Sequence, residues 1–121
     1  MDFEEKPVLN RADLMDRLDG DHELAAELAE LFISDVRDTL VSLQAAAEGG
    51  FTSEVERAAH SLKGAAANLS GERVRHVAAA VETAGKNNDM AAAAAAIKKL
   101  DPAVAELIDA LNTQIITAGR R

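Results

Sequence analysis

Apolar side chains recur every three or four residues along most of the chain, the spacing that places them on one face of an α-helix. Short polar breaks rich in glycine, asparagine and aspartate separate these periodic stretches. The pattern predicts one short helix followed by four longer ones. The expected ranges are roughly 11–18, 22–48, from 53 or 54 to 69, 72–86 and 90–117.

The predicted helix starts carry residues that can cap them. A side-chain oxygen just before a helix accepts a hydrogen bond from a free backbone N–H of the first turn. The candidates are Asn10, Asp21, Thr52 or Ser53, and Asp89. Pro102 lies inside the last stretch, where it predicts either a kink or a stop followed by a newly capped helix.

The short links and the apolar positions together predict how the helices pack. Links of two to four residues cannot cross a bundle, so successive long helices must run antiparallel. The expected fold is all-α, an antiparallel up-down four-helix bundle with a short N-terminal extra helix. Residues 1–9 are expected to form an extended lead-in to a single domain over 10–118. The side chains expected to face the core are Leu14, Leu18, Leu24, Leu28, Leu31, Val36, Leu40, Leu43, Val74, Val77, Val81, Ile97, Leu100, Val104, Leu107, Leu111 and Ile115.

The composition bears on the make-up of the core, on which partners the chain can bind and on where it is located. Of the 121 residues, 48% are hydrophobic but only 2% are aromatic, so the core must rely on Ala, Leu, Val and Ile. The formal net charge of −8 disfavours binding to nucleic acid and to anionic membranes. The absence of Cys excludes disulfides and thiolate zinc sites, and it fits a cytoplasmic location. The first ten residues lack the apolar core of a signal peptide, and the longest apolar run, 90–97, is too short to span a bilayer.

One predicted helix carries the chemistry that the sequence offers. With His60 set at zero and about 100° per residue, four apolar residues fall together between roughly 180° and 240°. They are Val55, Leu62, Ala66 and Leu69. This stripe is expected to face the core, so His60 is expected at the centre of the exposed face. Its neighbours on that face are Glu56, Arg57, Lys63, Gly64 and Ala67.

The neighbours of His60 suit a histidine that accepts a phosphoryl group. Lys63 lies three residues on, within side-chain reach, and its ammonium can offset the roughly −2 charge of a phosphoryl group. Gly64 costs a helix about 1 kcal/mol relative to Ala, but its missing side chain leaves space beside the imidazole. Ala67 keeps that space open one turn further along. An exposed neutral ring nitrogen is a competent nucleophile toward an acyl phosphate.

Residues 58–70, AAHSLKGAAANLS, resemble the His-x-x-Lys-Gly motif of histidine-containing phosphotransfer domains and the small residues that follow it. Other segments are similar to that family as well. They are LDGD at 18–21, ELAELF at 27–32, the break near Gly49 and the Val81-Glu82 pair. The similarity covers about residues 10–112. Ser70-Gly71 departs from it, because the family commonly has Gly followed by a small residue there.

The resemblance implies a phosphoryl carrier without autonomous kinase activity. His60 would take a phosphoryl group from a receiver-domain aspartate and deliver it to another, with Lys63 and Gly64 completing the acceptor site. Glu82 would hold the His60 ring. The residues expected to contact the partner or the ring are Glu56, Arg57, Ser61, Ala67, Asn68 and Glu82.

The same resemblance implies the partners. They would be response-regulator receiver domains, a hybrid histidine kinase, or both, acting on a monomeric chain in the cytoplasm. Mg²⁺ would belong to the receiver alone, and this chain would need no cofactor or metal of its own.

Four alternatives stay open on the sequence. The chain could be the phosphoacceptor domain of a chemotaxis-type kinase, in which ATP on a separate domain is the donor. It could be a purely helical interaction module in which His60 is ordinary surface. Glu56 and His60 could be two metal ligands, although no third is evident nearby, and Glu82 could be an ordinary boundary carboxylate. His22 and His76 are expected to be surface residues.

Overall fold

A computed structural model describes residues 5–119 of the chain, and within them every regular element is helical. The helices are α1 (Arg11–Arg17), α2 (His22–Glu48), α3 (Thr52–Asn68), α4 (Glu72–Lys86), α5 (Met90–Leu111), the π-helix η2 (Asn112–Ile116) and α6 (Thr117–Gly119). The short first helix and the four long ones therefore lie where the sequence predicts them. The division into a lead-in over 1–9 and a domain over 10–118 stays a prediction, and residues 1–4 lie outside the described part.

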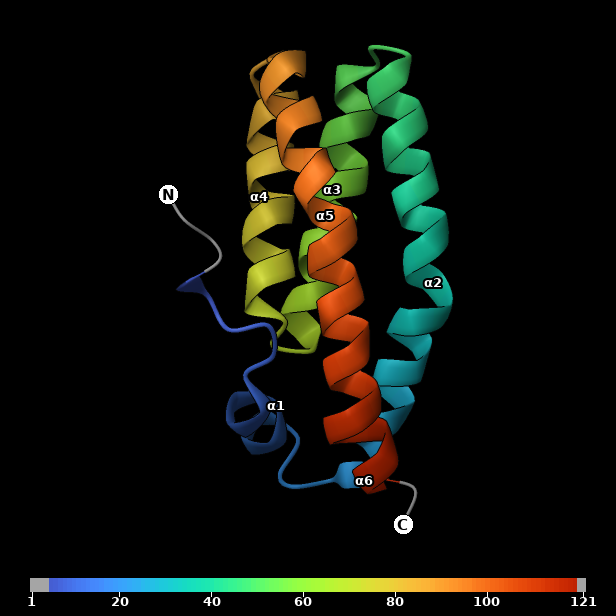
Figure 1. The fold of residues 1–121 in the computed structure, drawn as a ribbon, viewed down its shortest axis with the longest axis vertical. Coiled ribbons are helices and arrows are strands. Elements are labelled where there is room, and N and C mark those ends of the chain that lie inside the picture. Colours follow the sequence, from blue (N-terminus) through green and yellow to red (C-terminus); the bar gives the residue numbers. More distant parts are fainter. Residues whose placement is uncertain (1–4, 120–121) are drawn as a thin grey trace.

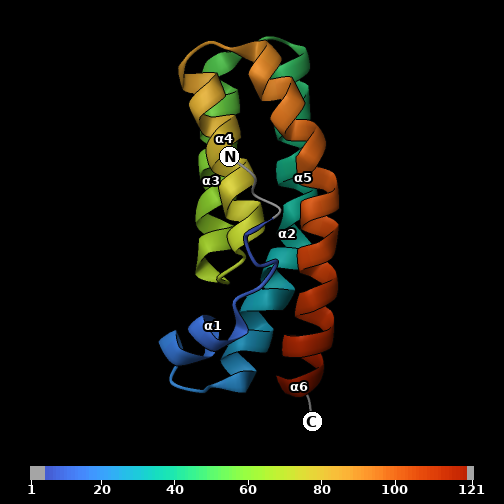
Figure 2. The same cartoon turned by 60° about the vertical axis from the view of Figure 1, so that its left-hand side comes forward.

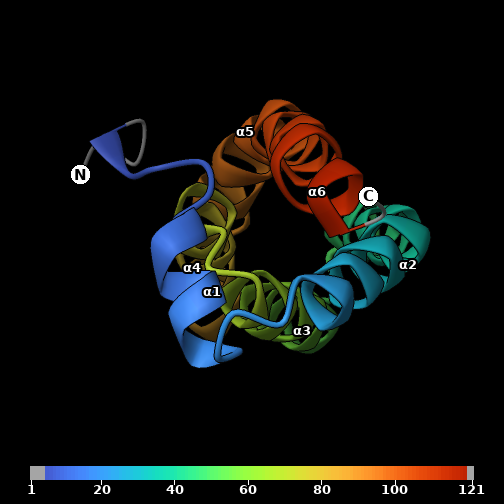
Figure 3. The ribbon, with the colours of Figure 1, turned by 90° about the horizontal axis from the view of Figure 1, so that it is seen from below.

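The four long helices form an antiparallel bundle (Figure 1). Seen along the bundle, α3 lies between α2 and α4, and α5 closes the ring between α4 and α2 (Figure 3). Each long helix is joined to the next by three residues, 49–51, 69–71 and 87–89, which forces the reversal of direction. The predicted up-down topology is confirmed.

α2 and the α5–η2–α6 rod are longer than α3 and α4, and they extend past them at one end of the bundle (Figure 2). α1 crosses the bundle at that end, below α3 and α4 (Figures 1 and 3). α5, η2 and α6 follow one another without a break, so helical structure continues from Met90 to Gly119.

Most of the predicted caps are present. The side chains of Asn10, Asp21 and Asp89 accept hydrogen bonds from the backbone N–H groups of Asp13, Leu24 and Ala92. The prediction for α3 was wrong. Neither Thr52 nor Ser53 caps it, because the helix already begins at Thr52 and the residue before it is Phe51, which has no capping side chain.

Pro102 does not end the last helix, so the predicted stop and new cap are absent. α5 runs through it from Met90 to Leu111. Proline removes one backbone donor and leaves a carbonyl of the preceding turn without its partner. Asp101 and Pro102 are both exposed, so water can reach the helix at this point.

The core is built from aliphatic and alanine side chains. Val74, Val77 and Val81 of α4 are fully buried, as are Leu100, Leu107 and Leu111 of α5. On α2 the prediction was partly wrong, because Leu24 is 38% exposed and Leu31 is 59% exposed. The buried stripe of that helix instead uses Ala25, Ala29, Phe32, Val36 and Leu43. The small alanines allow α2 to pack closely, and the leucines beside them are left at the edge.

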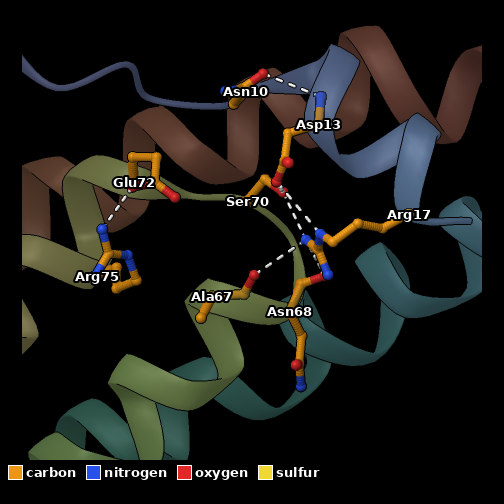
Figure 4. Close-up of polar contacts among 8 residues, drawn as sticks. All are labelled: Asn10, Asp13, Arg17, Ala67, Asn68, Ser70, Glu72 and Arg75. Atoms are coloured by element: carbon orange, nitrogen blue, oxygen red, sulfur yellow. Dashed lines mark hydrogen bonds and ion pairs between the residues drawn. The ribbon is translucent and has the colours of Figure 1, made fainter.

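A polar cluster attaches α1 to the link between α3 and α4 (Figure 4). The Arg17 guanidinium donates to the carbonyls of Ala67 and Asn68, both at 3.2 Å, and to Ser70 Oγ at 2.6 Å. Ser70 Oγ in turn donates to Asp13 Oδ2 at 2.6 Å. The cation therefore caps the last carbonyls of α3, where the helix dipole favours positive charge.

Within residues 5–119 no helix combines the length and apolar character that crossing a membrane requires.

Candidate functional site

α3 carries His60 on its outer face. Val55, Leu62 and Ala66 are buried at 2% exposure or less, and Leu69 just after the helix is 1% exposed. This apolar stripe fixes the rotation of α3, so the opposite side must face solvent. The His60 side chain is 68% exposed, as the sequence predicts.

Glu82 of α4 reaches across to this face. Val81 beside it is fully buried, which places Glu82 at the edge of α4 next to α3. Its Oε2 lies 2.7 Å from His60 Nδ1, and its Oε1 lies 2.5 Å from Lys63 Nζ. The three side chains therefore form one cluster, and the Glu82 side chain within it is only 19% exposed.

The electrostatics of the cluster keep Glu82 ionised. The hydrogen bond from Lys63 lowers the pKa of the Glu82 carboxyl most strongly, and the hydrogen bond to His60 lowers it further, while partial burial opposes both. An ionised carboxylate can only accept hydrogen bonds, so the Nδ1 of His60 must carry the proton. In the neutral form of the ring, Nε2 then carries no proton and keeps a lone pair.

Gly64, one turn after His60, faces open space. A Cβ built on Gly64 would meet no atom within 4 Å outside the neighbouring backbone of its own helix. Gly64 itself is exposed and Ala67 is half-buried. The surface of α3 at Gly64, one turn from His60, is therefore unobstructed.

The other predicted residues lie on the same helix as His60. Arg57, Ser61 and Asn68 are exposed, and Glu56 is half-buried. The other two histidines lie elsewhere. His22 is exposed at the start of α2, while His76 is half-buried on α4, where partial burial and then the charges of Lys6 and Arg75 lower its pKa.

An apolar groove between α2 and α3 was not predicted from the sequence. It encloses about 150 Å³, and Ser61 and Ala65 on its α3 side lie next to His60 and Gly64 in the sequence. Leu28 and Leu31 line its α2 side, which explains the exposed Leu31. The sequence of α2 does carry an indication of this groove. Leu24, Leu28 and Leu31 form a second apolar stripe beside the one that is buried.

The groove becomes polar toward the other end of α3. There the lining includes Asp38 and Thr39 of α2 and Glu54, Arg57 and Ser61 of α3. Thr39 and Ser61 line both parts, so one continuous surface runs along the α2–α3 seam.

A metal-binding role for Glu56 and His60 has no support in this geometry. Among the described residues, no group of three or more His, Asp or Glu side chains is arranged to hold a metal ion. His60 Nδ1 is instead engaged by Glu82.

Comparisons with known proteins give one match. The model of the Hpt domain family matches residues 27–114, which is more than half of the 121 residues and includes the whole His60–Lys63–Glu82 cluster. Neither the curated proteins nor the solved structures gave a match. Because the family model covers more than half of the chain, and because α3 presents an exposed histidine within the matched residues, the chain belongs to the Hpt domain family.

Proposed function

We propose that this chain is a histidine phosphotransfer protein or domain of a phosphorelay, in which His60 receives a phosphoryl group from one receiver-domain aspartate and passes it to another. The observation that supports this most directly is the His60 side chain, which is 68% exposed and is engaged by Glu82 at Nδ1. Membership of the Hpt family implies phosphotransfer between such partners.

The transfer step is a direct displacement at phosphorus. The lone pair of His60 Nε2 attacks the phosphorus of the aspartyl phosphate, the N–P bond forms, and the P–O bond to the aspartate carboxylate breaks. The ring becomes positively charged while Nδ1 keeps its proton and its hydrogen bond to Glu82. Because the carboxylate faces that developing charge, Glu82 stabilises the transition state more than the starting state. Delivery to the second receiver is the reverse reaction.

Lys63 has two roles in this scheme. Before transfer, its ammonium is paired with Glu82 and not directed at an empty phosphate position. After transfer, the three phosphoryl oxygens offer a stronger anionic partner within reach of the same side chain. We therefore propose that Lys63 divides its contacts between Glu82 and the phosphoryl group.

The α2–α3 seam is the proposed docking surface for the receiver. Its apolar groove provides area that a partner can bury, and its polar end provides charges that can fix the orientation. The Mg²⁺ that assists the reaction is expected on the receiver. Monomeric state, cytoplasmic location and lack of autonomous kinase activity are parts of the same proposal.

The proposal is tested by offering both kinds of donor to the purified chain. A receiver domain loaded with acetyl phosphate and Mg²⁺ is expected to transfer its phosphoryl group to the wild type and not to His60→Gln. A chemotaxis-type kinase domain supplied with ATP is the second donor. Phosphorylation by the kinase domain and none by the receivers would favour the alternative function.

A further inference from the structure

α3 and α4 lie close together at Gly85. A Cβ built there would lie 3.0 Å from the backbone nitrogen of Glu56, 3.1 Å from the carbonyl oxygen of Thr52 and 3.2 Å from Val55 Cγ1. Two of these three atoms belong to the α3 backbone and cannot rotate away. Any side chain at position 85 would therefore have to move α4 away from α3.

This contact lies within about one turn of the His60 cluster on both helices. Gly85 follows Glu82 by three residues on α4, which is about 4.5 Å along the axis. Glu56 precedes His60 by four residues on α3, about 6 Å along the axis in the matching direction, since the two helices are antiparallel. The spacing of the helices at Gly85 therefore sets their spacing at Glu82.

We propose that Gly85 is a positioning residue for phosphotransfer, because it holds α4 at the distance from which Glu82 reaches both His60 and Lys63. The inference rests on the proposed function of His60. It adds a residue that touches neither the phosphoryl group nor the ring and acts only through Glu82.

A small separation of α3 from α4 would be enough to weaken the contacts of Glu82 with His60. Ordinary van der Waals contact begins at 3.4 Å, so a Cβ at 3.0 Å would require the helices to separate by about 0.4 Å or more. The Glu82–His60 hydrogen bond of 2.7 Å would approach or pass the upper end of good geometry, about 3.2 Å. Glu82 cannot easily turn to compensate, since its other oxygen is bound by Lys63.

Gly64 provides a contrast. Gly64 lies inside α3, where glycine costs about 1 kcal/mol relative to alanine, and Gly85 lies in the last turn of α4. A Cβ on Gly64 meets open space, whereas a Cβ on Gly85 meets the backbone of the next helix. The two residues therefore serve the site differently: Gly64 clears room for the phosphoryl group, and Gly85 sets the reach of Glu82.

The test uses the whole chain labelled with ¹⁵N-histidine. The ¹⁵N shifts of the His60 ring, measured where the ring is neutral, report how much of it carries the proton on Nδ1, and phosphoramidate serves as the phosphoryl donor. Gly85→Ala is expected to lower the Nδ1–H population and to slow phosphorylation several-fold. Val104→Ala on α5, a core substitution away from the α3–α4 contact, is the control. It is expected to reduce stability while leaving the His60 tautomer unchanged.

A purely structural role for Gly85 predicts a different result. A folded Gly85→Ala protein with the wild-type tautomer and rate would overturn the proposal. If Gly85→Ala does not fold, Glu82→Asp tests the premise of the proposal, that the reach of Glu82 to His60 is critical, because it shortens the side chain by one methylene. An unchanged tautomer in Glu82→Asp would show that the spacing is not critical. A wild type that phosphoramidate cannot phosphorylate would instead contradict the proposed function, while the tautomer measurements would still decide the role of Gly85.

Discussion

Replacing Glu82 with alanine removes the group that holds His60 without changing the proposed phosphoacceptor itself. The hydrogen bond between Oε2 and Nδ1 is 2.7 Å long, and such a bond to a charged acceptor contributes about 1.5–3 kcal/mol. The His60 side chain is 68% exposed, so solvent screening reduces the expected contribution to about 1 kcal/mol. A difference of 1 kcal/mol corresponds to about five-fold in a rate.

We therefore expect Glu82→Ala to be phosphorylated about five-fold more slowly than the wild type. The carboxylate fixes the proton on Nδ1 and faces the positive charge that develops on the ring, and the variant loses both effects. The assay is the rate of phosphorylation by phosphoramidate, followed by ³¹P NMR, because this donor needs no docking surface.

Glu82→Gln is the matched control. It keeps an oxygen that can accept from Nδ1 but loses the charge, so its rate is expected to fall between those of the wild type and Glu82→Ala. Thermal unfolding of each protein shows whether the bundle is intact. A folded Glu82→Ala that reacts at the wild-type rate would refute the reasoning and leave Glu82 as an ordinary boundary carboxylate.

Further predictions concern the residues around this pair. Lys63→Ala should slow transfer from a receiver several-fold at low salt and less at high salt, because the Lys63 side chain is still 32% exposed and its charge is partly screened. Equal rates at low salt would contradict this. Gly64→Ala should raise the free energy of unfolding by up to about 1 kcal/mol, whereas Gly64→Leu should slow transfer, and normal transfer by Gly64→Leu would disprove the steric argument. Leu31→Glu should weaken receiver binding in a titration. Val41→Glu, at an equally exposed position on the α2–α5 side, should leave binding unchanged. Equal effects of the two substitutions would exclude the groove as the docking surface. Because the pKa of Glu82 lies below its usual value of 4.5, its stabilising contribution is present above that pH and is lost as the pH falls through the lowered pKa. The difference in unfolding free energy between the wild type and Glu82→Gln should therefore shrink in acid, and a difference that does not change with pH would contradict the assignment.

The helices and the exposed face of α3 could be predicted from the sequence because both depend on local order. Apolar spacing sets each helix, and the stripe of Val55, Leu62 and Ala66 determines that His60 points outward. Short polar links then fix the antiparallel arrangement. None of these features depends on which side chains of two neighbouring helices are in contact.

The remaining features depend on contacts between helices, which spacing along one helix does not determine. Leu31 could not be assigned to the surface, because α2 has two apolar stripes and only packing decides which one is buried. The role of Gly85 depends on its register against Glu56. Lys63 and Glu82 are 19 residues apart in the sequence, so their pairing, which alters the expected role of Lys63, required the structure.

The central claim, that His60 is the phosphoacceptor, is tested most directly by locating the phosphate. The wild type and His60→Gln are treated with phosphoramidate, and the modified residue is identified by mass spectrometry under conditions that preserve phosphohistidine. We expect one phosphate on His60 that is labile in acid and stable in base, and none on His60→Gln, whose circular dichroism should remain that of a folded helical bundle. Phosphate on His22 or His76, or phosphate retained by His60→Gln, would contradict the account.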